Sequence, residues 1–126
     1  MTQTEKELLL RDLCARLPYE VKVQYKDDIF TIDYISGIYE EIKLDTPDRY
    51  TIDISEIKPY LFPMSSMTDE DKEEYCQLQQ RVIYNSKGPV NEDVTKYINW
   101  CYKKHLDINN LIPIGLAIDA ANLNLY

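Results

Sequence analysis

The spacing of apolar residues changes along the chain from a helical period to an alternating one and back, and this change most constrains the fold. Near the start, Leu10, Leu13 and Leu17 recur at the spacing of one helix face. Between residues 21 and 54, apolar and polar residues alternate, which is typical of half-buried strands. Helical spacing returns after Thr68. The sequence therefore predicts an α+β fold.

The first predicted helix covers about residues 4–16. Thr4 and Glu7 have the spacing of a capping box, in which each side chain satisfies the backbone N–H of the other. Pro18 ends the helix, because the residue before a proline disfavours helical dihedral angles. Three ionisable residues lie between the apolar positions of this helix: Arg11, Asp12 and Arg16.

The alternating segment predicts four short strands, at about residues 21–26, 30–34, 38–44 and 50–55. The Asp27-Asp28 pair supplies the first turn. In the second strand, Phe30, Ile32 and Tyr34 are expected on the core side. Because tight turns join neighbouring strands, we expect a four-stranded antiparallel meander or a small SH3-like barrel.

The second half of the chain predicts two C-terminal helices and an apolar tail. Residues 57–64 contain two prolines and are expected to form an extended or single-turn connector over the sheet. One helix begins after Thr68 and the next begins at Asn91, each with acidic residues in its first turn. The tail, residues 106–126, is expected to pack back onto the core. No linker interrupts the 126 residues, which predicts a single α+β domain over 1–126.

Charge is unevenly distributed. The chain has 14 Lys and Arg against 22 Asp and Glu, a net charge of −8, which argues against general binding to nucleic acid or to anionic membranes. From residue 27 to 56 there are nine acids and two bases. Solvated surface is the simplest interpretation of these acids, and mimicry of nucleic acid is the alternative. The acidic face would be formed by Asp33, Glu40, Glu41 and Asp53.

Cysteine and histidine are sparse. Cys14, Cys76 and Cys101 contain no CxxC pair, which indicates reduced thiols in a cytoplasmic setting, with no metal or cofactor. His105 follows Cys101 by one helical turn and precedes Asp107, a spacing that a nucleophilic site could use. The sequence supplies no oxyanion glycine or helix N-terminus at Cys101. We therefore expect buried apolar cysteines and a packed histidine rather than catalysis.

Trp100 is flanked by lysines. Residues 81–104 hold five bases and two acids, a local excess of positive charge in an acidic chain. A tryptophan beside ammonium groups could anchor a partner or stack on a base. The alternative is that Trp100 packs against the C-terminal tail. The residues predicted to form an interaction face are Trp100, Lys96, Lys103, Lys104, His105 and Tyr60.

Three stretches carry a resemblance to known sequences. They are the Leu-rich opening at residues 7–17, the segment 57–68 with its Lys-Pro-Tyr-Leu run, and Trp100, His105 and Asp107 followed by Gly-Leu-Ala at 115–117. Together they resemble small uncharacterised proteins common in Bacteroidales genomes, prophages and other mobile elements. The resemblance implies a bacterial or phage cytoplasmic origin, and it implies no activity.

The leading hypothesis is a non-enzymatic accessory or protein-interaction module with a protein partner, and without nucleic acid or membrane as partner. One alternative is a phage-encoded inhibitor of host defence that uses the acidic face. The other is a nucleotide-binding or hydrolytic protein that uses Trp100, Lys103 and His105.

Overall fold

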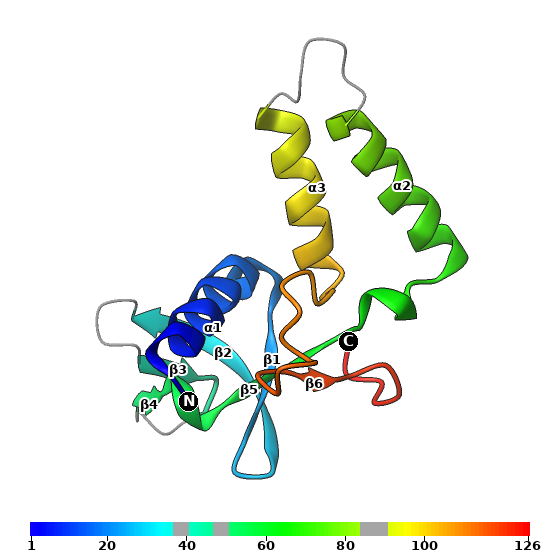
Figure 1. The fold of residues 1–126 in the computed structure, drawn as a ribbon. Helices are drawn as coiled ribbons and strands as arrows, with labels where there is room; N and C mark the ends of the chain where they lie inside the picture. The colour runs from blue at the N-terminus through cyan, green and yellow to red at the C-terminus, as the bar shows by residue number, and fades with distance from the viewer. Residues whose placement is uncertain (37–40, 47–50, 84–90) are drawn as a thin grey trace.

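A computed structural model describes residues 1–36, 41–46, 51–83 and 91–126. Its three α-helices and six strands are shown in Figure 1. The elements are α1 (Gln3–Arg16), β1 (Lys22–Tyr25), β2 (Asp28–Ser36), β3 (Glu41–Leu44), β4 (Thr51–Asp53), β5 (Lys58–Leu61), α2 (Asp69–Ile83), α3 (Asn91–Lys103) and β6 (Ile118–Asp119). Three short 3-10 helices lie at Leu17–Tyr19, Ile54–Glu56 and Met64–Ser66. Among the helices of the described ranges, none combines the length and the apolar character that a membrane span requires.

The strands form one open, mixed sheet in the order β4-β3-β2-β1-β5-β6. The predicted α+β class is confirmed, and the first four strands pair antiparallel with their chain neighbours. However, β5 pairs with β1, and β6 pairs parallel with β5. The prediction of a four-stranded meander or a closed SH3-like barrel is therefore wrong, because two further strands extend one edge.

The fifth strand lies where the sequence predicted a connector. Pro59 pairs with Val23 of β1 although proline has no N–H to donate. One residue further along, the Tyr126 hydroxyl accepts from the Lys22 N–H at 2.9 Å and donates to the Tyr60 carbonyl at 2.8 Å. A tyrosine hydroxyl from the tail thus bridges β1 and β5 where the two strands stop pairing directly. Burial raises the pKa of Tyr126 to about 12, so the hydroxyl keeps the proton that it donates.

The first helix begins earlier than predicted. The capping box uses Thr2 and Glu5 rather than Thr4 and Glu7. The Thr2 side chain accepts from the Glu5 N–H at 3.1 Å, and the Glu5 carboxylate accepts from the Thr2 N–H at 3.2 Å. Both pairs of residues have the same spacing. The outer pair caps because the helix can extend to Gln3 and gain further backbone hydrogen bonds.

A β-bulge in β2 changes which residues face the core. The pairing shifts between Ile32 and Tyr34, so that two residues of β2 oppose one residue of β3. Ile32 and Ile35 therefore both turn inward. Tyr34, predicted to face the core, is 58% exposed. Strict alternation fails here because the extra residue reverses the phase of the strand.

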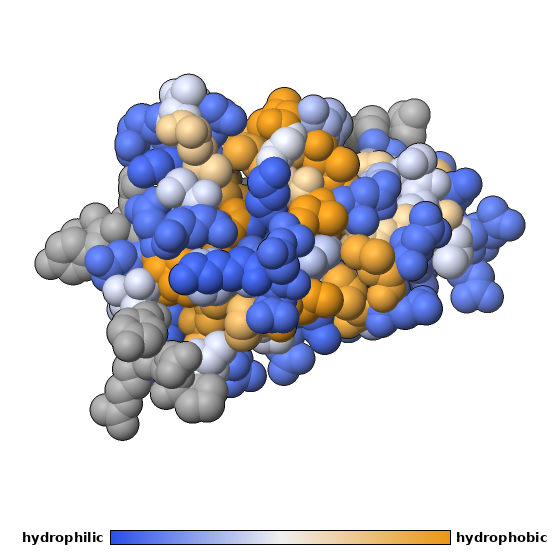
Figure 2. All heavy atoms as spheres, turned by 90° about the horizontal axis from the view of Figure 1, so that it is seen from below, coloured by the Kyte–Doolittle hydropathy of each residue, from blue (hydrophilic) through white to orange (hydrophobic). Residues whose placement is uncertain are grey.

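The core lies between α1 and one face of the sheet. Leu9 and Leu13 of α1 are fully buried against strand residues such as Val23 and Ile42. Exposed large apolar side chains occur at scattered positions elsewhere. On the face seen from below, hydrophobic residues are interspersed with hydrophilic ones (Figure 2).

Helices α2 and α3 lie side by side and project away from the sheet (Figure 1). We call this helix pair the arm. The hydroxyls of Tyr75 and Tyr97 form a hydrogen bond of 2.9 Å between the two helices. None of the described side chains of α2 is fully buried. Helix α2 is therefore held mainly by its contacts with α3.

Candidate functional site

A pocket of about 530 Å³ lies where the arm joins the rest of the chain. Three segments form its walls: residues 62–71, which lead from β5 into the first turn of α2; residues 103–106 at the end of α3; and the tail. Its lining includes Phe62, Met67, Asp71, Lys103, His105 and Tyr126. Backbone hydrogen bonds fix two of these segments together. The Phe62 N–H donates to the His105 carbonyl at 2.8 Å, and the Asp107 N–H donates to the Phe62 carbonyl at 2.9 Å.

The end of α3 places His105 in the pocket wall. The Leu106 N–H donates to the Cys101 carbonyl, and the His105 N–H donates to the Tyr102 carbonyl, each at 3.0 Å. These two bonds form a Schellman motif, in which the residue at the His105 position is usually glycine. His105 has the left-handed conformation that this position requires, with φ of 59°. The chain therefore has a histidine at a position where glycine would be less strained.

The His105 ring is stacked on Tyr126. The ring centroids are 3.6 Å apart and the planes differ by 17°. The Nδ1 atom is buried and has no hydrogen-bond partner in the described part of the chain. Burial lowers the pKa of His105 from 6.5 to about 4, helped by the positive charges of Arg16 and Lys22. The imidazole is therefore neutral at pH 7.

This neutral histidine predicts a pH dependence of stability. Between about pH 6.5 and pH 4 the unfolded chain binds a proton at His105 that the folded chain does not bind. The free energy of unfolding should therefore fall as the pH falls through this range. His105→Asn, which tolerates the left-handed conformation, should lose less stability between pH 7 and pH 4.5 in urea unfolding. An equal loss in both proteins would contradict the lowered pKa.

The lysines of the predicted interaction face divide into two groups. Lys104 lies in the pocket wall, with its Nζ 3.4 Å from an Asp71 oxygen and 5.9 Å from the centre of the Trp100 ring. Lys103 also lines the pocket, is exposed, and forms no ion pair with any described residue. Lys96 does not line the pocket and pairs with Glu92 at 3.1 Å.

Trp100 and Tyr60 lie elsewhere. The Trp100 indole N–H donates to Glu74 at 2.9 Å, and the ring packs against Tyr75 with centroids 6.1 Å apart. These partners belong to α2, so the hydrogen bond and the ring contact of Trp100 are made with the neighbouring helix. Tyr60 is 6% exposed, and its ring is not accessible to a partner.

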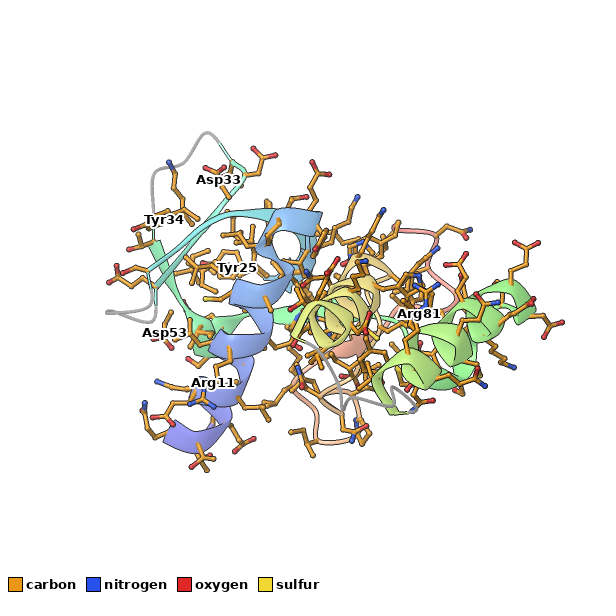
Figure 3. All side chains as sticks on the ribbon, turned by 90° about the horizontal axis from the view of Figure 1, so that it is seen from above. Arg11, Tyr25, Asp33, Tyr34, Asp53 and Arg81 are labelled. Carbon is orange, nitrogen blue, oxygen red and sulfur yellow. The ribbon has the colours of Figure 1, made fainter. Side chains whose placement is uncertain are left out.

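Basic side chains lie among the acids of the strand region. Asp33 is exposed beside Tyr34, whereas Asp53 lies near α1 (Figure 3) and its carboxylate is 3.7 Å from the Lys6 ammonium. Glu41 is the cross-strand partner of Asp53. Lys43 follows Glu41 by two residues in β3 and points to the same side. Glu40, the fourth predicted member, lies outside the described residues.

The Cys101, His105 and Asp107 spacing does not assemble a nucleophile. Cys101 is fully buried, and this burial raises the pKa of its thiol to about 11. Cys14 and Cys76 are exposed, so the expectation of buried cysteines is wrong for these two. The Asp107 carboxylate accepts from the N–H groups of Leu111 at 2.7 Å and Ile112 at 2.9 Å. Within the described ranges, no group of three or more His, Cys, Asp or Glu side chains could hold a metal ion.

The sequence did not indicate a buried ion pair between Asp12 and Arg16, which lies next to the turn that carries His105. Asp12 is 1% exposed and Arg16 is 0% exposed. The Arg16 guanidinium contacts both Asp12 oxygens, at 2.6 and 3.1 Å, and donates to the Leu106 carbonyl at 2.6 Å. Asn109 donates to Asp12 at 2.8 Å, and the guanidinium lies 4.9 Å from the centre of the Tyr102 ring. This network ties α1 to the turn that carries the pocket histidine.

Comparisons with protein-family models, with curated proteins and with solved structures found no match to the chain. The resemblance to small Bacteroidales and prophage proteins, and the origin that it implies, therefore stay predictions.

Proposed function

We propose that the chain is a non-enzymatic protein-interaction module whose arm binds a partner protein with a basic surface. The observation that carries the proposal is the outward side of α2. By helical spacing, five residues share this side, which we call the α2 outer face: Asp69, Glu70, Glu73, Gln77 and Gln80. All five are exposed.

The acids of the α2 outer face lack an ion-pair partner among the described residues, although the helix dipole stabilises Asp69 and Glu70 in the first turn. Asp71, on the other side of the helix, instead pairs with Lys104. The inward side of α2 is occupied by α3, through Tyr75 and through the bond from Trp100 to Glu74. A basic surface complements three exposed carboxylates that form no ion pair with a described residue, and such complementarity steers association and orients the partner.

Two further observations favour the arm over the rest of the surface. The arm projects from the sheet (Figure 1), so a partner can reach α2 without contacting β1–β4. The strand acids are interrupted by Lys43 and Lys6, which gives less support to nucleic-acid mimicry by the sheet. Cys101 is buried and the Asp107 carboxylate is bonded to backbone N–H groups, so neither residue gives support to a nucleophilic enzyme.

The experiment is a photo-crosslinking capture in the cells of origin, with a benzophenone amino acid at Gln77 or, as control, at the exposed Thr51 of β4. The protein captured through Gln77 is then purified and its affinity is measured by calorimetry. Neutralising Asp69, Glu70 and Glu73 together should weaken binding roughly tenfold, and the wild-type affinity should fall with added salt.

A matched control removes the same charge elsewhere. The exposed acids Asp27, Asp28 and Asp33 are neutralised together in a second variant. This variant should bind within about twofold of wild type, because charges beyond a Debye length of the contact are screened. Equal weakening of both variants would show that only the net charge matters and would contradict binding at the arm. Unchanged binding of the arm variant would also overturn the proposal.

A further inference from the structure

The pocket at the base of the arm brings two lysines together with a stacked pair of aromatic rings. We propose that it binds a small organic anion that carries a flat ring. This inference is independent of the proposed partner protein, because it rests on the pocket walls and not on the α2 outer face. The volume of about 530 Å³ lies within the usual range for small-molecule sites, about 300–1,000 Å³.

The charge of the pocket favours an anion. Lys103 and Lys104 both line it, and Asp71 is the acid that faces them. Asp71 is already paired with Lys104 at 3.4 Å, and this contact holds Lys104 at the pocket wall. Lys103 remains without an ion-pair partner among the described residues. A carboxylate or a phosphate could pair with Lys103 and share Lys104.

The other side of the pocket favours a flat ring. His105 and Tyr126 form a stacked pair, and Phe62 lies edge-on to Tyr126 with centroids 5.7 Å apart. Aromatic faces and edges of this kind accept a further ring by offset stacking. Met67 and Leu106 add apolar surface. Because the imidazole is neutral, it contributes stacking surface without adding a third positive charge.

The conformation and hydrogen bonds of His105 and Tyr126 give a second reason to assign ligand binding to the aromatic wall of the pocket. His105 occupies the left-handed end of α3, where glycine would be less strained. Tyr126 is fixed by hydrogen bonds to Lys22 and Tyr60, and the His105 ring rests on it. The two rings are therefore held in place before any ligand arrives, which lowers the entropic cost of binding.

The experiment is isothermal titration calorimetry with four probes: AMP, benzoate, adenosine and inorganic phosphate. AMP and benzoate carry both a ring and an anion, whereas adenosine lacks the charge and inorganic phosphate lacks the ring. At least one of the first two should bind saturably, at least about tenfold more tightly than adenosine or inorganic phosphate. Preference for AMP would assign a phosphate ligand, and preference for benzoate a carboxylate ligand.

Three variants test the location. Lys103→Gln should weaken the tighter probe about tenfold, the usual effect of losing a charge-assisted hydrogen bond. Lys96→Gln removes the same charge from the same helix outside the pocket and should leave binding unchanged. Ala121→Trp, at an exposed lining position, should block the pocket. Circular dichroism checks that each variant is folded.

The proposal is overturned if neither ring-bearing anion binds saturably, or if inorganic phosphate binds as tightly as AMP and benzoate. Binding that survives Ala121→Trp, or that Lys96→Gln weakens as much as Lys103→Gln, would overturn it as well. Neutralising Asp69, Glu70 and Glu73 on the α2 outer face should not abolish probe binding, so the pocket and the arm can fail separately.

Discussion

Asp12→Asn is expected to lower the free energy of unfolding by about 3–5 kcal/mol. The substitution keeps the shape of the side chain but removes the negative charge that faces the Arg16 guanidinium. Arg16 is 0% exposed, so water cannot replace the lost carboxylate. One of its nitrogens, Nη1, is already buried without a hydrogen-bond partner among the described residues. The guanidinium therefore depends on the Asp12 carboxylate for most of its electrostatic stabilisation.

The control for this prediction is the neighbouring Arg11→Gln, which changes an exposed charge on the same helix and should shift stability by no more than about 0.5 kcal/mol. A double variant, Asp12→Leu with Arg16→Met, should be less destabilised than Asp12→Asn alone, because it leaves no unpaired charge. Urea unfolding measures all three. A cost for Asp12→Asn no larger than that of Arg11→Gln would show that the pair is hydrated in solution.

Asp107→Ala is expected to lower the free energy of unfolding by about 2–4 kcal/mol, since two charge-assisted hydrogen bonds are lost together. The carboxylate is 3% exposed and accepts from the N–H groups of Leu111 and Ile112. Leu111 is fully buried, so its N–H would be left without a partner. The tail should then detach from the core at this turn before the sheet unfolds.

Asp119→Ala is the matched control for Asp107→Ala. The Asp119 carboxylate also accepts from a backbone N–H, that of Ala121 at 2.9 Å, but at an exposed position where water can substitute. We expect a cost of about 1 kcal/mol or less. Similar unfolding midpoints in urea for the two variants would contradict the structural role assigned to Asp107.

Local patterns in the sequence were sufficient for the helices and for the first four strands, and insufficient for the rest of the sheet. Alternation predicts a strand only while its phase holds, and the bulge in β2 moved Tyr34 to the surface. The fifth strand was missed because prolines usually break strands. In this strand, Pro59 pairs with Val23 of β1. The hydroxyl of Tyr126, which is 66 residues from Tyr60 in the sequence, forms hydrogen bonds to both strands at the next position.

The candidate site shows the same limit. Lys103, Lys104 and His105 are consecutive, so their joint position at one helix end was predictable from the sequence. Their partners in the pocket wall, Phe62 and Tyr126, come from distant segments that only the tertiary structure brings together. The buried pair of Asp12 and Arg16 has the i,i+4 spacing of an ordinary surface ion pair. Nothing in that spacing indicates burial, which depends on the turn that packs over it.

The functional account depends on the arm being the part of the chain that meets its partner, with α1 and the sheet as its support. Hydrogen exchange followed by mass spectrometry, on the chain alone and in complex with the protein captured through Gln77, tests this claim most directly. The account predicts that binding slows exchange over residues 69–82 and leaves β2 and β3 unchanged. Slower exchange in β2 and β3, with α2 unchanged, would contradict it.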